Sequence, residues 1–363
     1  MKAMVPSLLL LPAAVAFVRH HPALPVLRPG TRTSAPLMSA APAATDTESL
    51  GDKIERALVI RFGKDKVQRV VDCFNKSRKG EAFEMQWPDK GLQQASSYME
   101  GLFAEPWHDA ADGNMYPWAA KLEQQAGVIA SELKAVMAKK GVEKQGTNIW
   151  SVAARDDALA YGPDWRTLVL QDRVWDPVNM QLFPKTAAIV QECGIPSCEV
   201  FFAKQAPRTG IKPHTDDTNF ILTAHLGLDV PEGECRMTVG DETREWRNNK
   251  MLIFDTSFVH STANDSDRPR TVLLMRFFHP EVTADERRAL QFIFEVVDNP
   301  LLVSDDDPAV ANANAAAAAA AAAGKSVPLP VAEAEPLNTE GMTRQERRQL
   351  EREQKKKAAK RQG

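Results

Sequence analysis

The chain has 363 residues, of which 44% are hydrophobic and 26% charged, and its formal net charge is −3. This composition is that of a globular protein with a substantial core, and four cysteines are too few for a disulfide framework in so long a chain. Charge is unevenly spread: residues 1–45 carry +4, residues 46–300 carry −8 and residues 341–363 carry +6. Because the central body is acidic, nucleic-acid binding by its surface is not expected.

Residues 1–45 have the composition of a targeting sequence, since they contain four basic residues and no Asp or Glu. The apolar run from Leu8 to Phe17 is too short to span a bilayer and ends in small residues, as at a signal-peptide cleavage site. An acid-free stretch bearing Arg, Ser, Thr and Pro follows. This order resembles the bipartite presequence of algae with complex plastids. We predict a plastid address, with the secretory pathway and the mitochondrion as alternatives, and no transmembrane segment in the mature chain.

Residues 46–145 are predicted to form a helical region. Apolar residues recur at helical spacing from Asp52 to Phe74, and a second helix is expected from Gln93 to Phe103. A third helix is expected from Pro117 to Met137, with the proline near its first turn and Lys139-Lys140-Gly141 at its end. We interpret these helices as a small helical subdomain or a packing layer.

Residues 146–298 are predicted to be mainly β. From Trp165 onward short apolar runs alternate with turn residues: TLVLQ, CEVFFAKQ, FILTAHLGL, CRMTVG, MLIFD and TVLLMRFF. VGDET has the pattern of a tight hairpin, and Thr186–Cys193 is expected to be a short helix. Successive strands with few intervening helices indicate an antiparallel sandwich or jelly roll rather than a parallel α/β sheet.

Residues 299–363 are of low complexity. They contain a nine-alanine run from Ala315 to Ala323, a proline-rich spacer and a basic tail whose partner the sequence does not identify. Such a charge run is usually a solvated arm. The cysteines, Cys73, Cys193, Cys198 and Cys235, are expected to be free, with a pairing of Cys193 and Cys198 as the alternative.

A group of metal-binding residues lies within the β region. His214 and Asp216 are two residues apart in KPHTDDTN, and in an extended strand they would project from the same face. His260 follows in DTSFVHS. Two histidines and one carboxylate on one face of an octahedron leave three positions open, as in non-heme Fe(II) oxygenases. The sequence therefore predicts an iron site, with the neighbouring Asp217 directed to the opposite face.

Arg270 opens an apolar strand ten residues after His260. A guanidinium at the start of a buried strand is costly unless it meets an anion, and its planar fork suits a carboxylate. We predict that Arg270 binds the distal carboxylate of 2-oxoglutarate. Arg276 shares its face of the strand and is expected to pair with an acid at the barrel rim, with a second anion contact as the alternative.

Residues 101–290 resemble the aspartyl/asparaginyl β-hydroxylase family, through segments such as GLFAEPWHD, FPKTAAIVQE, PHTDDTN, AHLGLDVPEGECRMTVGDETREW, KMLIFDTSFVHSTAND and RTVLLMRFFHPEVT. The resemblance implies a double-stranded β-helix, a jelly-roll and cupin-like fold with N-terminal packing helices. It implies Fe(II), 2-oxoglutarate and O2 as cofactors, with ascorbate as reductant. It also implies that His214 and His260 bind iron, that Arg270 anchors 2-oxoglutarate, and that His225 approaches the other carboxylate of that cofactor.

Two departures from the family pattern bear on the substrate. The animal members have glycine where this chain has Asp216, so this chain offers the complete triad. They also carry arginines in the strand where this chain has Ile221 and Thr223. The family resemblance implies β-hydroxylation of an Asp or Asn side chain in a protein or peptide. A small molecule or a lipid-linked acyl group is the alternative substrate.

Other residues near the motifs are given structural roles. Trp246 is interpreted as a packing residue and His279 as a structural one. His108 lies in EPWHDAADG, where it is expected either to bind substrate or to be a solvated loop histidine. Two rival functions stay open: a non-catalytic jelly-roll binding module, and a cupin-like hydrolase or isomerase that uses zinc or manganese.

Overall fold

The computed structural model describes residues 48–139, 151–152 and 165–303. The predicted presequence, the Lys140-Gly141 end of the third helix and the low-complexity tail from residue 304 lie outside these residues. The plastid address therefore stays a prediction. Among the described helices, none has both the length and the apolar character needed to span a bilayer.

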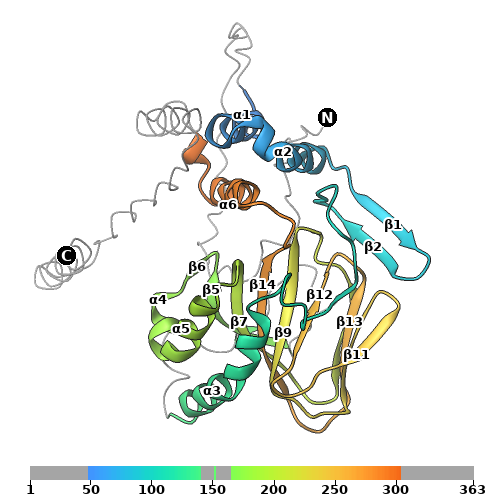
Figure 1. Cartoon of the computed structure of the whole chain (residues 1–363), viewed down its shortest axis with the longest axis vertical. Coiled ribbons are helices and arrows are strands. Elements are labelled where there is room, and N and C mark those ends of the chain that lie inside the picture. Colours follow the sequence, from blue (N-terminus) through green and yellow to red (C-terminus); the bar gives the residue numbers. More distant parts are fainter. Residues whose placement is uncertain (1–47, 140–150, 153–164, 304–363) are drawn as a thin grey trace, which may run out of the picture. The chain divides into compact units, whose positions relative to one another are not determined.

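Three helices gather at one end of the barrel in Figure 1: α1 (Leu50–Phe62), α2 (Lys64–Arg78) and α6 (Ala284–Asp298). The helical pattern predicted from Asp52 to Phe74 is confirmed, but it forms two helices instead of one. The break falls at Gly63, whose φ of 83° favours glycine and ends the first helix. A further helix, α6, was not predicted; it begins with a capping box between Thr283 and Glu286.

The helix predicted from Gln93 to Phe103 is wrong. Its first residues form β2 (Gly91–Ala95), which pairs with β1 (Phe83–Trp87) in a two-stranded hairpin. The alternating burial of β2 follows the strand period, and the buried Gln93 side chain donates to the Ser257 hydroxyl at 2.9 Å. Pairing with a distant segment therefore overrides the local helical pattern.

The third helix and the β region are confirmed. The third helix is α3 (Ala119–Met137), and the short helix predicted at Thr186–Cys193 is α5 (Pro184–Cys193), preceded by α4 (Pro177–Leu182). The larger sheet has the order β3-β12-β9-β14-β7-β5-β4, with β6 beside β5, and the smaller sheet has the order β11-β10-β13-β8. Their bounds are β3 Trp107–His108, β4 Ser151–Val152, β5 Trp165–Asp172, β6 Val174–Trp175, β7 Ser197–Gln205, β8 Thr209–His214, β9 Ile221–Asp229, β10 Cys235–Val239, β11 Glu242–Glu245, β12 Met251–Phe254, β13 His260–Asn264 and β14 Arg270–Phe278. A short 3₁₀ turn, η4 (Pro300–Val303), follows α6.

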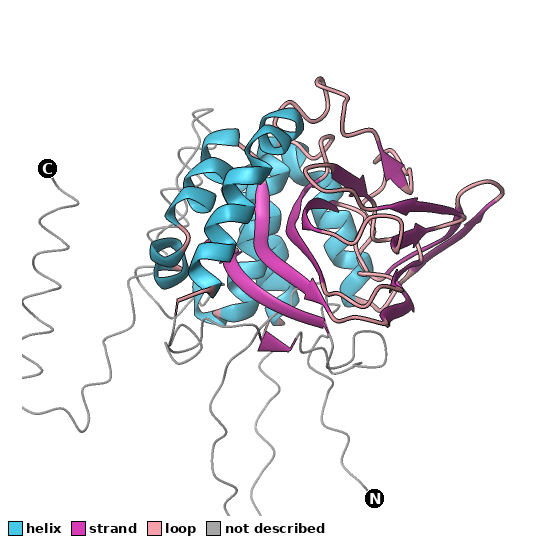
Figure 2. Cartoon of the chain, turned by 90° about the horizontal axis from the view of Figure 1, so that it is seen from below, coloured by secondary structure: helices cyan, strands magenta, loops and turns pink. Residues whose placement is uncertain are grey.

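The two sheets face each other and enclose a core. All pairings are antiparallel, and the hairpin predicted at VGDET joins β10 to β11. Side chains from β7 and β14 pack against those of β10 and β8, as Phe201, Leu274, Met237 and Ile211 show. The opposite face of the large sheet is covered by α3 and α5, and Figure 2 shows most helices to one side of the strands. The fold is the predicted double-stranded β-helix, mainly β with N-terminal packing helices.

Within the layer of α1, α2 and α6, an ion pair joins α2 to α6. Arg69 on α2 donates from Nε and Nη2 to the carboxylate of Glu286 on α6, at 2.8 and 2.7 Å. Glu286 is buried, and its carboxylate also accepts from the Thr283 backbone. Burial by itself would raise the pKa of Glu286, but these bonds outweigh it and the pKa is lowered.

Replacing Arg69 with alanine is expected to lower the free energy of unfolding by about 1–3 kcal/mol, because Glu286 would stay buried without its cation. A carboxyl whose pKa is lowered on folding stabilises the protein above its unfolded pKa, and this contribution is lost as pH falls through the folded pKa. Urea unfolding at about pH 7 and about pH 3 should show a difference that shrinks at the lower pH.

The matched control is Lys66→Ala, which removes an ion pair to Asp285 on the same two helices. That pair is 3.9 Å long and the lysine side chain is 51% exposed. Its loss should change stability by less than about 0.5 kcal/mol. If the two substitutions lower the free energy of unfolding equally, Arg69 does not stabilise the buried charge of Glu286.

Candidate functional site

The three predicted metal ligands meet at one place in the barrel. One ligand atom from each of His214, Asp216 and His260 lies within 4.8 Å of the others. The two histidines are directly opposite each other in the β8–β13 pair, with ring centroids 4.2 Å apart. Antiparallel pairing therefore joins residues that are 46 positions apart in the sequence.

Asp216 reaches the group by a route that differs from the prediction. β8 ends at His214, so Asp216 is not in a strand. Its backbone N–H donates to the Thr256 carbonyl at 2.8 Å, and Asp217 turns the chain with a φ of 65°. The spacing of two still places both side chains at the site, with His214 Nε2 3.9 Å from Asp216 Oδ1. A turn held by the 255–259 segment, and not the strand period, orients the carboxylate.

Both histidines present the same nitrogen to the site. His214 Nδ1 lies 2.7 Å from the Lys212 carbonyl, and His260 Nδ1 lies 2.9 Å from the Phe258 carbonyl. A carbonyl only accepts, so Nδ1 carries the proton and Nε2 keeps a lone pair for a cation. Burial, with His214 close by, lowers the pKa of His260 to about 4. His260 is therefore neutral near pH 7, which is the form that binds metal.

The Arg276 guanidinium lies between the carboxylates of Asp216 and Glu199. Its Nη2 is 4.0 Å from Asp216 Oδ2, and its Nη1 is 3.6 Å from Glu199 Oε1. The prediction that Arg276 pairs with an acid is confirmed, although the acids are inside the barrel rather than at its rim. Burial raises the pKa of Glu199 to about 7 despite the arginine. Arg276 thus ties the orientation of Asp216 to a second buried carboxyl.

Arg270 lies at the other end of the same inner row of β14. It is fully buried, and within the described residues none of its three guanidinium nitrogens has a hydrogen-bond partner. Its guanidinium carbon lies 3.9 Å from the centre of the Trp246 ring and 5.4 Å from that of Trp165. Burial lowers the pKa of Arg270 to about 9. A desolvated cation with its donors unused is what a buried binding site for an anion requires.

His225 lies between the arginine and the metal ligands. It accepts a hydrogen bond at Nδ1 from the Trp246 indole N–H at 3.2 Å, and the two rings are stacked at 15°. Burial, with the charge of Arg270 nearby, holds the pKa of His225 well below its ordinary value. Because Nδ1 accepts, the neutral ring carries its proton on Nε2 and offers a donor there.

The cavity at the metal ligands is lined on its other sides by apolar and hydroxyl side chains. Among the described residues, the buried hydroxyls of Thr223 and Thr256 have no hydrogen-bond partner. The apolar wall includes Phe201, Met237 and Leu274. The cavity thus combines unused hydroxyl groups along its wall with three residues that could hold a metal, and Trp165, which contacts Arg270, is among its lining residues.

Residues 123–280 match the family model of aspartyl/asparaginyl beta-hydroxylase. Over this segment the chain is similar to that hydroxylase family. The mouse aspartyl/asparaginyl beta-hydroxylase is 31% identical over 207 residues, which are 55% of this chain and 27% of that protein. The ornithine lipid ester-linked acyl 2-hydroxylase of Rhizobium tropici is 28% identical over 173 residues, which are 47% of this chain and 60% of that protein. The chain therefore spans about a quarter of the length of the mouse relative.

Among solved structures, a cupin 2 conserved barrel domain protein from Salinispora arenicola aligns with 40% of this chain and 99% of its own. The TM-score is 0.24 and the sequence identity is 14%. The fold assignment of the hydroxylase domain accordingly rests on its own strand pairing.

Two residues of the hydroxylase domain have surroundings that differ from those expected. His108 is neither solvated nor on a loop: it lies buried in β3, and its Nδ1 is 2.6 Å from the Tyr116 hydroxyl. His108 is not among the residues that line the cavity at His214, Asp216 and His260, called the metal cavity from here on. Trp246 does more than pack, because it contacts both Arg270 and His225. The indole N–H, which needs a partner when buried, was the signal in the sequence that pointed to such a role.

His279 and the four cysteines have the structural roles that were predicted for them. His279 Nε2 is 3.2 Å from the Phe103 carbonyl, and its Nδ1 accepts from the Glu281 backbone at 3.1 Å. His279 therefore connects the end of β14 to the loop before β3. The four cysteines are free, and Cys73, Cys198 and Cys235 are buried, so the alternative pairing of Cys193 with Cys198 is wrong.

Proposed function

We propose that this hydroxylase is an Fe(II)- and 2-oxoglutarate-dependent dioxygenase. The observation that carries the proposal is the pairing of a two-histidine, one-carboxylate group with a buried arginine whose donors are unused. His214, Asp216 and His260 would hold the metal, and Arg270 would hold the distal carboxylate of 2-oxoglutarate. With both cofactors bound, one atom of O2 enters a substrate C–H bond and the other enters succinate as CO2 leaves.

The side chains of the domain contribute binding, orientation and exclusion of water. The carbonyls of Lys212 and Phe258 keep both ligating nitrogens unprotonated, and Arg276 orients Asp216. Trp246 covers one face of the Arg270 guanidinium and fixes the ring of His225. The Nε2 proton of His225 is then available to a carboxylate oxygen in the cavity. The apolar wall excludes water, which strengthens each of these contacts.

Two substrate classes follow from the relatives. The mouse relative bears the name of an enzyme that hydroxylates aspartyl and asparaginyl residues, and the Rhizobium relative bears that of an enzyme acting on ester-linked acyl chains. We propose hydroxylation of an unactivated C–H bond in one of these two classes. The family name favours a protein or peptide side chain as the substrate. The apolar side chains that line a second cavity, beside the candidate metal ligands, favour an acyl chain.

The test is turnover of the cofactor by the purified full-length chain. With Fe(II), 2-oxoglutarate, ascorbate and O2, succinate should form, and a chelator should abolish it and added Fe(II) restore it. Metal analysis after native purification separates the rivals, because a zinc or manganese hydrolase would carry its own metal and form no succinate. If the chain binds neither Fe(II) nor 2-oxoglutarate, it is a binding module and the proposal fails.

A further inference from the structure

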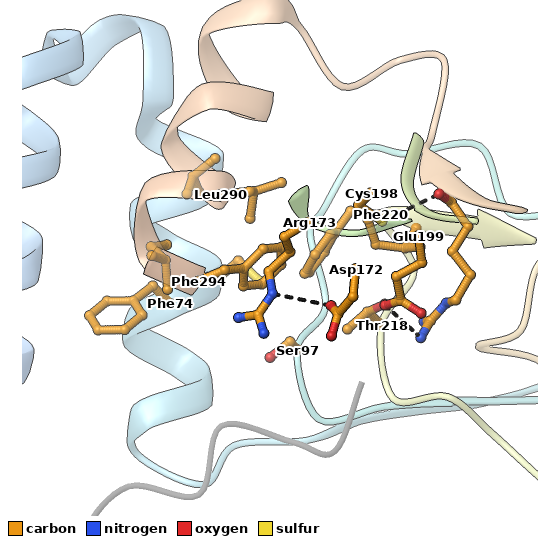
Figure 3. A pocket seen from close by; sticks show the side chains of 15 residues that line it. Phe74, Ser97, Asp172, Arg173, Cys198, Glu199, Thr218, Phe220, Leu290 and Phe294 are labelled. Atoms are coloured by element: carbon orange, nitrogen blue, oxygen red, sulfur yellow. Dashed lines mark hydrogen bonds and ion pairs between the residues drawn. The ribbon is translucent and has the colours of Figure 1, made fainter. Parts of the chain in front are cut away.

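A second cavity lies between the helical layer and the barrel. Its helical wall comes from α2 and α6 and its other wall from β5, β7, β9, β14 and the loop before β9. In Figure 3, Leu290 and Phe294 of α6 lie on one side and Asp172, Glu199 and Thr218 on the other. The apolar lining residues are Val70, Cys73, Phe74, Cys198, Phe220, Ile221, Leu290, Ile293 and Phe294.

This second cavity continues the metal cavity along the inside of the barrel. Side chains two positions apart on a strand share a face, and three strands place one such residue in each cavity. These pairs are Glu199 and Phe201 on β7, Ile221 and Thr223 on β9, and Arg276 and Leu274 on β14. Arg276 lines both cavities. The two cavities are therefore neighbours, with the Arg276–Asp216 contact at their junction.

The charged side chains of the second cavity are already matched with one another. Arg276 faces Glu199 and Asp216, as described above. Arg173 donates to Asp172 at 3.3 Å and also to Asp298. The Arg173 and Asp172 side chains are 26% and 28% exposed, so they form the solvent-accessible rim of the second cavity. Glu199 and Arg276 are buried. The rest of the wall is mainly aliphatic, thiol and aromatic, and it also includes the hydroxyls of Ser97 and Thr218.

We propose that the second cavity holds the alkyl chain of an acyl substrate whose polar head group stays at the Asp172–Arg173 rim. This inference rests on the proposed function, since it names the substrate class of the same site. A chain that entered past Phe294 and Ile221 would reach the Arg276 junction, where its C–H bonds come next to the metal ligands. Apolar walls favour such a chain in proportion to the methylenes they cover.

The same walls disfavour the other substrate class. A carboxylate or carboxamide carried into the cavity would need several hydrogen-bond partners to replace its water. Both lining arginines already face carboxylates and the Ser97 hydroxyl pairs with that of Ser77, so among the described lining hydroxyls that of Thr218 is the one without a partner. Ile221, which faces the junction, offers no hydrogen-bond partner. An Asp or Asn side chain is therefore the poorer occupant.

The test measures binding of straight-chain acylcarnitines, which carry an ester-linked acyl chain and a soluble head group, to the full-length chain loaded with Mn(II) and 2-oxoglutarate. Octanoyl, dodecanoyl and palmitoyl esters below their micelle concentrations should bind with affinity that rises about fourfold per methylene until the cavity is full. Peptides carrying one Asp or one Asn should not compete. Calorimetric binding of 2-oxoglutarate in the same samples reports separately on the proposed function.

Two substitutions change the cavity in opposite directions. Cys73→Phe fills it from α2 and should weaken dodecanoyl binding at least tenfold without changing 2-oxoglutarate affinity. Phe294→Ala widens it at a half-buried position and should move the optimum to longer chains. The matched control is Phe103→Ala, which removes an equal ring that is 50% exposed and outside the cavity.

Four outcomes decide between the claims. An affinity independent of chain length, or competition by the Asp or Asn peptide, would overturn the acyl proposal and leave the cofactor proposal standing. If the wild-type protein does not bind 2-oxoglutarate, the proposed function is overturned, regardless of its affinity for the acyl esters. If Cys73→Phe does not fold, the shift between Phe294→Ala and Phe103→Ala decides alone. Identical behaviour of those two variants would count against the cavity.

Discussion

Replacing Arg270 with leucine is expected to remove 2-oxoglutarate binding and to leave the cofactor-free protein at least as stable as the wild type. Arg270 is fully buried with no hydrogen-bond partner among the described residues, so it lowers the stability of the free protein. An apolar residue at this position would remove the cost of burying the charge, and exchanges of buried charged groups for apolar residues of similar volume are often neutral or stabilising by about 1–4 kcal/mol.

The same substitution removes the cation that the cofactor needs. Losing one partner of a buried, hydrogen-bonded charge pair costs about 2–5 kcal/mol, which is a loss of affinity of at least roughly thirtyfold. Calorimetric titration of 2-oxoglutarate into the Mn(II) form measures the first effect, and urea unfolding of the cofactor-free protein measures the second. Arg270→Lys should lie between, because it keeps the charge and loses the planar fork.

The control for Arg270 is two positions away on the same chain segment. Arg268 is 65% exposed and pairs with Asp229 at 2.7 Å. Arg268→Leu should change both readouts by less than about 0.5 kcal/mol. A large loss of stability in Arg270→Leu together with normal 2-oxoglutarate binding would show that the guanidinium is a structural group and not the anchor.

Replacing Asp216 with asparagine is expected to lower iron affinity at least about a hundredfold, since even partners one step removed from a metal contribute ten- to a hundredfold. Asparagine keeps the size of the side chain and the backbone bond to Thr256, so the loss is one of charge. Arg276 would then lose its ion pair with residue 216 and keep the one with Glu199, which weakens the orientation of the asparagine side chain. Iron titration by absorbance, with 2-oxoglutarate present and O2 absent, measures the effect.

Asp217→Asn is the matched control, because it makes the same chemical change one residue later. Asp217 has a φ of 65°, a conformation that asparagine adopts readily. Its iron affinity and succinate formation should equal those of the wild type. If Asp216→Asn keeps wild-type iron affinity, the two histidines are sufficient in this chain and the carboxylate is not a ligand.

The ligand group could be predicted because its spacing is local. His214 and Asp216 are two residues apart, and the apolar runs before His260 and after Arg270 identify both as residues at strand ends. The hairpin at VGDET and the strands from Trp165 onward were predictable for the same reason, since turn chemistry and strand period are written in windows of a few residues.

Other features depended on contacts between distant segments. The stretch from Gln93 has a helical pattern, yet Gln93 and Gln94 bond to Ser257, more than 160 residues away, and form a strand. His108 looks like a loop residue until β12 pairs with it and Tyr116 covers it. Trp246 could be identified as buried but not as the residue that contacts Arg270 and His225 together.

By itself the sequence determined the fold class and identified the candidate metal ligands and an arginine suited to a carboxylate, because residue type and strand spacing indicate each of them. Only the tertiary structure decided that Asp216 is oriented from a turn, that Arg276 lies between it and Glu199, and that α2 and α6 close an apolar cavity beside the metal ligands. The lining of this cavity alone brings together residues as far apart in the sequence as Val70 and Phe294. No short window contains such contacts, since they arise when two sheets and a helical layer bury their apolar faces against one another.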